Sequence, residues 1–156
     1  MKHFFLKAAF TLSLCAPWSP GYGHDAPHDV VPDAEKKVGK SLMKNAPTQT
    51  KGVSSVKVLG SLPLGKEFPT TAGRTFRVRT IVVQPGGVVA VHQHHQRPGM
   101  AYILEGEMVE TRSDREGSIV HGPGSVAFEK TGVTHYWENK TKKPAKALVV
   151  DIVAES

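Results

Sequence analysis

From Val53 onward, the chain is a series of short β-branched segments separated by glycine-containing turns. No strong helical pattern interrupts the series, and several segments alternate apolar with polar residues, as half-buried strands do. Regularly spaced short strands predict an all-β sandwich or barrel, so we expect one domain over residues 53–156. The expected strands are 53–59, 75–83, 88–94, 101–111 with a kink at 105–107, 118–121, 125–129, 134–138 and 147–154, and a turn is expected at 84–87.

The first 23 residues have the three parts of a secretory signal peptide. A basic start with Lys2 and Lys7 precedes an apolar run over residues 8–16 and a small-residue exit over residues 17–23. The apolar run is too short to anchor a protein in a bilayer. We therefore predict a signal peptide over residues 1–23, no membrane insertion of the mature chain, and a periplasmic or secreted protein.

The cysteine content and the charge of the chain indicate its compartment and its type of partner. The single cysteine, Cys15, lies in the predicted signal peptide. It makes a lipoprotein the alternative, although Leu14 is too bulky for a good lipidation site. A mature chain without cysteine suits an oxidising compartment. The whole chain carries a net charge of +6, and loss of Lys2 and Lys7 leaves 18 basic against 14 acidic residues, or +4. These charges are scattered along the chain, so we expect no nucleic-acid partner.

Residues 24–52 differ in composition from the strands that follow them. They are polar, with several prolines and lysines and few large apolar residues. This composition predicts a flexible lead or a loosely docked arm ahead of the barrel. Within it, Val38, Leu42 and Met43 recur at near-helical spacing and predict a short helix inside residues 33–45.

Three histidines are the residues best suited to carry chemistry. His92 and His94 occupy alternate positions of an expected strand, so their side chains point to one face and that of His95 points to the other. A sharp turn at Gly132 can return the strand that carries His135 beside them. Imidazole is a common ligand of transition metals. His92, His94 and His135 are therefore predicted to hold a divalent metal ion, whether Fe, Mn, Zn, Cu or Ni.

The same residues resemble the two motifs of the cupin superfamily. The first motif corresponds here to Gly86, five residues, His92-Gln93-His94, then Gly99 at the family's glutamate position, then six residues and Gly106. The second corresponds to Gly124, five residues, Lys130-Thr131-Gly132 with lysine for the family's proline, two residues, His135, three residues and Asn139. The resemblance spans roughly residues 53–154. It implies a small type-2-like cupin, a jelly-roll barrel (double-stranded β-helix) with the metal inside.

The glycine at the family's glutamate position bears on the chemistry. Three neutral imidazoles would leave the full 2+ charge of the ion in place, with two or three coordination positions open to water or substrate. We therefore expect an anionic or bidentate substrate whose oxygen takes the carboxylate's place, and expect Gly99→Glu to raise metal retention. Glu105 and Glu129 are the alternative sources of a carboxylate.

Other side chains are candidates for a substrate pocket or for the barrel core. Arg97, Gly99 and Tyr102 are the candidates for a substrate pocket, with an exposed loop arginine as the alternative for Arg97. Tyr102, Tyr136 and Trp137 could line a pocket, and the alternative is a barrel core, in which aromatic residues are common. Phe76 and Phe128 are expected in the core, and His121 is expected at a solvated strand end.

The sequence does not single out one reaction. A three-histidine site fits oxygenation by a non-haem dioxygenase, lyase or isomerase chemistry, and metal-assisted hydrolysis of a small molecule. The alternative is a non-catalytic cupin that binds a metal or small ligand. Phosphate-binding loops and Ser-His-Asp arrangements are absent from the sequence. A homodimer is expected, because an open sheet edge seeks a partner, and the N-terminal arm is a candidate swapped strand.

Overall fold

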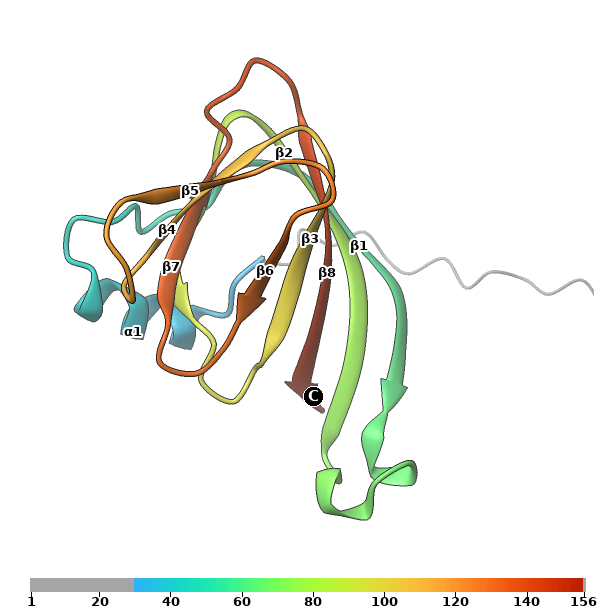
Figure 1. The fold of residues 1–156 in the computed structure, drawn as a ribbon. Helices are drawn as coiled ribbons and strands as arrows, with labels where there is room; N and C mark the ends of the chain where they lie inside the picture. The colour runs from blue at the N-terminus through green and yellow to red at the C-terminus, as the bar shows by residue number, and fades with distance from the viewer. Residues whose placement is uncertain (1–29, 156) are drawn as a thin grey trace, which may run out of the picture.

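The strands form one antiparallel sheet that curls into a nearly closed barrel, with a helix at one end (Figure 1). The computed structural model describes residues 30–155, so the predicted signal peptide and Cys15 lie outside the described residues. In chain order the elements are α1 (Asp33–Leu42), β1 (Lys51–Pro63), the 3-10 helices η1 (Leu64–Lys66) and η2 (Pro69–Thr71), β2 (Arg74–Gln93), β3 (Gly99–Glu105), β4 (Met108–Arg112), β5 (Ser118–His121), β6 (Val126–Glu129), β7 (Thr134–Glu138) and β8 (Ala145–Ala154).

The all-β prediction is confirmed, and most strand positions agree with it. The strands are ordered β5-β4-β7-β2-β8-β3-β6, and β1 pairs with β2 on the outside of this path. Strands β5 and β7 have the predicted bounds, and the predicted kink at 105–107 separates β3 from β4. The hairpin of β1 and β2 extends beyond the barrel (Figure 1). None of the helices in residues 30–155 has the length and hydropathy of a membrane-spanning segment.

Strand β2 is twice as long as expected, because the predicted turn at residues 84–87 is a bend inside it. The first half of β2 pairs with β8 and its second half with β7. At the bend, Gly86 adopts a φ of 70°, a conformation that glycine reaches without strain. The Gly86 N–H donates to the Asn139 carbonyl at 2.9 Å, and the Asn139 N–H donates to the Gly87 carbonyl at 2.9 Å. The backbone therefore stays paired through the bend, and one strand serves both sides of the barrel.

Inward-facing apolar residues of the strands fill the barrel interior. The buried apolar cluster comprises Val30, Val31, Ile81, Val83, Val89, Ala101, Ile103, Met108, Ala127, Trp137, Ala145 and Val149. The prediction that Phe76 and Phe128 belong to the core is wrong, since they are 38% and 69% exposed. Phe76 is out of step with the buried Ile81, and Phe128 directly follows the buried Ala127. Side chains alternate faces along a strand, so both phenylalanines lie on the outside of the barrel.

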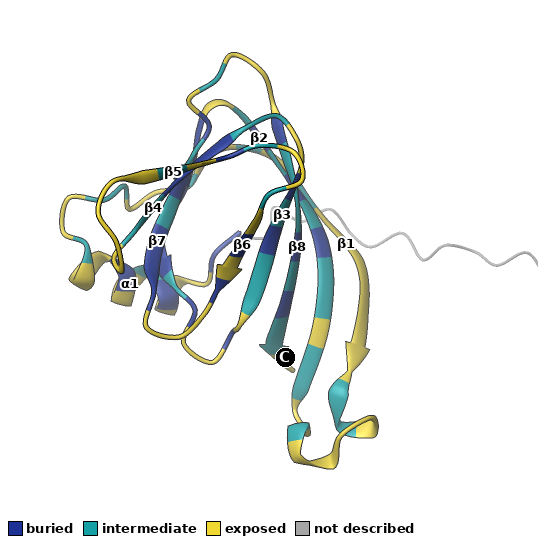
Figure 2. Cartoon of the chain, in the orientation of Figure 1, coloured by how far each residue is buried: buried dark blue, intermediate teal, exposed yellow. Residues whose placement is uncertain are grey.

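The described part of the expected lead, residues 30–52, lies against the barrel. Val30 and Val31 are buried in the core cluster, and α1 packs across β2 with Gly39 facing it. A Cβ added at Gly39 would lie 2.8 Å from the backbone of His92, so only glycine allows this approach. Figure 2 shows buried positions on α1 and, by contrast, exposure along most of β1. The helix predicted within residues 33–45 is present, and it lies next to the strand that carries the histidines.

Candidate metal centre

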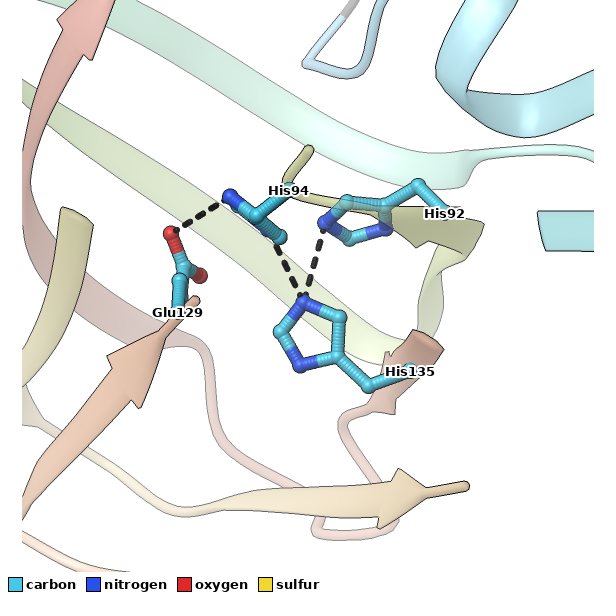
Figure 3. Close-up of side chains that lie close together, drawn as sticks. All are labelled: His92, His94, Glu129 and His135. Carbon is cyan, nitrogen blue, oxygen red and sulfur yellow. Dashed lines mark hydrogen bonds and ion pairs between the residues drawn. The ribbon is translucent and has the colours of Figure 1, made fainter. Parts of the chain in front are cut away.

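The structure brings His92, His94 and His135 together inside the barrel (Figure 3). His92 of β2 pairs directly with His135 of β7, and His94 follows the last residue of β2. The ring centroids of His92 and His135 are 4.5 Å apart, and that of His94 is 4.9 Å from His92. All three side chains are buried.

Hydrogen bonds orient the three rings so that their Nε2 atoms converge. The Nδ1 atoms of His92 and His94 lie 2.7 and 3.1 Å from the carbonyl oxygens of Ala90 and Arg97, which can only accept. The protons are therefore assigned to Nδ1, and the Nε2 atoms carry lone pairs. The Nε2 of His135 lies 3.0 Å from that of His94 and 3.1 Å from that of His92. Lone pairs at these distances repel one another unless a cation lies between them.

Burial keeps the rings of His92 and His94 neutral. It lowers the pKa of His92 well below its usual value, and the neighbouring His135 and His94 add to this effect. Burial also lowers the pKa of His94 to about 2, with a further contribution from the positive charge of Arg97. Neutral imidazole is the form that binds metal ions, so His92 and His94 are ready to bind at physiological pH.

Glu129 of β6 supplies the carboxylate that the motif lacks. Each of His92, His94, Glu129 and His135 offers one ligand atom, and these atoms lie within 4.8 Å of one another. Glu129 Oε2 lies 3.6 Å from His94 Nδ1 and, among the described residues, has no hydrogen-bond partner. Burial raises the pKa of Glu129, because an unpartnered carboxylate is costly away from water. A divalent cation would bind this oxygen and offset that cost, so the donor set fits a metal ion.

Gly99 does not leave an opening at the centre. It pairs with Glu129 across β3 and β6 and with Asp151 across β3 and β8. A Cβ at Gly99 would lie 2.5 Å from the Val150 carbonyl oxygen, so a glutamate side chain has no room there. The family's motif places the carboxylate on β3, at the position of Gly99, whereas in this chain the neighbouring strand β6 carries it at Glu129. The other alternative, Glu105, is exposed and is not part of the cluster.

Glu110 of β4 was not singled out by the sequence, yet it supports the centre directly. Its carboxylate is fully buried and accepts hydrogen bonds from His135 Nδ1 at 2.5 Å and from His121 Nε2 at 3.0 Å. Burial alone would raise the pKa of Glu110, but the hydrogen bonds from His135 and His121 and the charge of Arg112 lower it below its usual value. His121 is buried, so the prediction of a solvated strand end is wrong. A carboxylate behind a metal-binding histidine fixes the ring's orientation and tautomer.

A cavity of about 50 Å³ adjoins the histidine cluster. Its walls are mostly apolar, and its polar lining residues are Arg79, His92, His94, Arg97 and Glu129. The aromatic residue in the wall is Trp137, a core residue, whereas Gly99 and Tyr102 do not line this cavity. Tyr102 lies between the inward-facing Ala101 and Ile103 and points away from the barrel interior.

Arg97 lines the cavity, but its guanidinium is already paired. It is 6% exposed, so it is not an exposed loop residue. Its Nε and Nη2 donate to the Glu35 carboxylate at 2.7 and 2.5 Å, and its Nη1 donates to Asp151 at 3.0 Å. Burial opposes its charge, but the bonds to Glu35 outweigh this and raise the pKa of Arg97. Arg97 therefore ties α1 to the barrel beside the centre. No pattern in the sequence indicates that the residue 62 positions earlier is its partner.

Comparison with known proteins identifies the fold. The cupin-domain family model matches residues 79–151. The solved structure of KdgF from Halomonas sp. is 13% identical, with 67% of this chain and 81% of that chain covered and a TM-score of 0.51. TT1209 from Thermus thermophilus is 27% identical, with 64% and 86% covered and a TM-score of 0.46. The cupin domain of an XRE family transcriptional regulator from Enterobacter cloacae is 14% identical, with 65% and 96% covered and a TM-score of 0.49. No curated protein matches the chain.

Proposed function

We propose that this chain, which belongs to the cupin superfamily, holds one divalent transition-metal ion between His92, His94, Glu129 and His135. One observation carries the proposal: four donor groups from three strands and a loop converge within 4.8 Å in a buried site. Nitrogens bound about 2.1 Å from one ion and at right angles to each other are about 3.0 Å apart. The observed Nε2 separations of 3.0 and 3.1 Å suit such an arrangement.

We further propose that the loaded protein is an enzyme acting on a small molecule. A bound metal supplies Lewis acidity or, for iron, affinity for oxygen, which is compatible with oxygenase, lyase, isomerase or hydrolase chemistry. The residues of the chain orient the metal ligands and exclude water. Glu110 holds the His135 ring, and the apolar cavity wall limits entry of water. The cavity touches His92, His94 and Glu129, so a ligand inside it would lie beside the proposed ion.

The second candidate is a metal-binding module without turnover, and the way the cavity is covered favours it. Val30 lines the cavity, and its carbonyl accepts a hydrogen bond from Arg79 Nη1 at 3.3 Å. With Glu35 bound to Arg97, the N-terminal segment leaves room only for a small ligand. A resting cover of this kind favours retention of a metal, because a substrate would have to pass it to enter the cavity.

Elemental analysis of the purified protein, with two single variants, tests the metal proposal. His94→Ala removes one proposed ligand, and His95→Ala removes the exposed neighbouring ring as the matched control. We expect about one equivalent of metal in the wild type and in His95→Ala, and its loss in His94→Ala. Equal metal content in all three proteins, or none in a folded wild type, would contradict the proposal.

The element found then decides how turnover is examined. Iron directs the search to oxygen consumption with candidate substrates, and zinc directs it to hydrolysis and water activation. A fully loaded protein that consumes no oxygen and converts no small molecule supports the binding module instead of the enzyme.

We also propose that the protein is exported to the periplasm or secreted. The support is the basic, apolar and small-residue succession of residues 1–23, which lie outside the described residues. Fractionation of cells that express the full chain, with mass determination of the exported form, checks this. An intact chain found only in the cytoplasm would contradict it.

A further inference from the structure

Two buried side-chain atoms in residues 30–155 have no hydrogen-bond partner, and both belong to residues that line the cavity. They are Oε2 of Glu129 and Nε of Arg79. Unsatisfied buried polar atoms are rare in folded proteins, and each calls for an explanation. The proposed metal ion explains the carboxylate oxygen. It does not explain the guanidinium N–H, which can bind only an acceptor.

The charges around Arg79 are also unbalanced. Three guanidiniums, those of Arg77, Arg79 and Arg97, share the single carboxylate of Asp151, at 2.8, 3.3 and 3.0 Å. Glu35 is bound to Arg97 and therefore compensates a second charge. One positive charge remains next to an apolar cavity, where an uncompensated charge is costly.

Glu129 is the remaining group that could offset this charge, and the metal would remove it from that role. Its negative charge acts on both Arg79 and Arg97. With a divalent ion on Glu129, that carboxylate neutralises part of the ion's charge instead. The ion and the arginine cluster then leave the cavity with a net positive charge of about two. Binding of the metal therefore leaves a positive charge in the cavity that a bound anion would offset.

Resting on the proposed metal centre, we propose that the loaded cavity binds a small carboxylate between the ion and Arg79. One carboxylate oxygen would face the ion and the other would accept from Arg79 Nε–H. One water needs about 10–15 Å³ of such space, so the cavity of about 50 Å³ holds roughly three to five non-hydrogen atoms. Formate and acetate are within this limit, and benzoate exceeds it.

This assignment moves the anion-binding role from Arg97 to Arg79. Both side chains line the cavity and are at least 94% buried, with exposed fractions of 6% and 5%. The donors of Arg97 are bound by Glu35 and Asp151, whereas Arg79 keeps its Nε–H. Burial lowers the pKa of Arg79 to about 10, against the opposing effect of Asp151, so the side chain still carries its charge at neutral pH.

The test is a calorimetric titration of formate, acetate and benzoate into the metal-loaded and the metal-free protein. Variants are Arg79→Met and, as a matched control, Arg115→Met, which changes an exposed arginine on a turn away from the cavity. We expect formate and acetate, but not benzoate, to bind the loaded wild type and Arg115→Met. Loss of a charge-assisted hydrogen bond should weaken binding to Arg79→Met by about 10- to 100-fold. The metal-free protein should bind neither anion.

The metal content of each sample separates the two proposals. A wild type without metal contradicts the proposed function itself. A loaded wild type that binds no small carboxylate, or an Arg79→Met variant that is loaded and binds it as tightly as the wild type, overturns this inference alone. If Arg79→Met does not fold, Arg79→Lys keeps the charge and removes the Nε–H. Unchanged affinity in that variant also overturns the inference, and a loss of about threefold or more supports it.

The outer face of the barrel carries a second, independent inference. Side chains of five neighbouring strands form an apolar surface on the outside, and the strand registers place them in continuous rows. We define this outer apolar face as Leu62, Phe76, Val78, Met100, Tyr102, Val126, Phe128, Leu148, Val150 and Ile152. An antiparallel sheet facing water normally carries polar residues on that side, so an apolar outer face indicates a covered surface.

We infer that a second copy of this chain covers the outer apolar face. Leu62, Phe76, Val126 and Phe128 are the most exposed of these side chains, at 46, 38, 42 and 69%. A stable interface buries roughly 800 Å² per partner, and a second copy would cover these side chains. Two apolar sheet faces pack directly on each other, as in β-sandwiches. A two-fold axis through the face would bring it against itself. In the described residues, the outer edge of β1 pairs with no strand, so the sheet can accept a neighbour there as well.

Light scattering of the purified full chain tests this inference. Phe128→Lys places a charge on the face, and Val120→Lys places one at an apolar position of β5 that is 59% exposed and outside the face. We expect a dimer for the wild type and Val120→Lys and a folded monomer for Phe128→Lys. A monomeric wild type at high micromolar concentration, or a dimer that Phe128→Lys leaves intact, would overturn it and would assign the face to another partner.

Discussion

The contact between β3 and β8 at Gly99 makes a quantitative prediction. Substitution by alanine would place a Cβ 2.5 Å from the Val150 carbonyl oxygen and 3.0 Å from the Asp151 Cβ. These atoms belong to a paired strand, so they cannot move aside as a flexible side chain does. Overpacking of this kind typically costs about 1–3 kcal/mol. The intrinsic preference of a strand for alanine over glycine returns only about 0.5–1 kcal/mol.

We therefore expect Gly99→Ala to lose about 2 kcal/mol of the free energy of unfolding, since the overlap exceeds the intrinsic gain. With a urea m-value of about 2 kcal/mol/M, the midpoint falls by about 1 M. Gly60→Ala is the matched control, because Gly60 also lies in a strand and its added Cβ meets no described atom within 4 Å. That variant should be neutral or slightly stabilised.

Equal stability of the two variants would refute the reasoning. It would mean that β3 and β8 are farther apart at Gly99 than described, so that a larger side chain could stand there. The same contact reverses the expectation for Gly99→Glu. That variant should lose stability, and it should not retain more metal than the wild type, because Glu129 already supplies the carboxylate.

Three further predictions concern buried carboxylates. Glu110→Gln should weaken metal binding by about 10- to 100-fold in a chelator competition, as losses behind a metal-binding histidine do, whereas Asp114→Asn, at an exposed carboxylate, should not. Burial raises the pKa of Asp151, but its three arginines outweigh this and lower it. The stabilisation by ionised Asp151 is therefore complete above the unfolded pKa of about 3.9 and is lost as pH falls through the folded pKa. The urea midpoint of the wild type should fall over this pH range, and that of Asp151→Asn should fall less. Glu35→Gln should increase amide exchange in α1 as its buried ion pair is broken, with the exposed Glu67→Gln unchanged.

Local patterns were sufficient to predict the strands and the three histidines. The alternation of side chains along a strand places His92 and His94 on one face whatever the strand pairs with. Glycine turns bounded β5 and β7 in the same local way. The helix at residues 33–42 was also visible, from apolar residues at near-helical spacing.

The features that complete the site depend on which strands pair and in what register. Glu129 reaches the histidines because it lies opposite Gly99 across β3 and β6, and no local pattern fixes that pairing. Arg97 is buried because a helix from far earlier in the chain brings Glu35 to it. Phe76 and Phe128 were misplaced for a related reason. Their strands are apolar on both faces, so composition alone could not say which face is the interior.

Glu110 accepts hydrogen bonds from both His135 and His121, and this has a practical consequence for spectroscopy. A cation on the far nitrogen of His135 draws electron density through the ring and makes its Nδ1–H a stronger donor. The carboxylate charge available to His121 then falls, and the Nε2–H proton of His121 shifts its resonance. His121 is not one of the four converging donors, so it can be isotope-labelled and observed without altering them. Its imidazole signal therefore reports, in solution, whether the centre of the barrel is loaded.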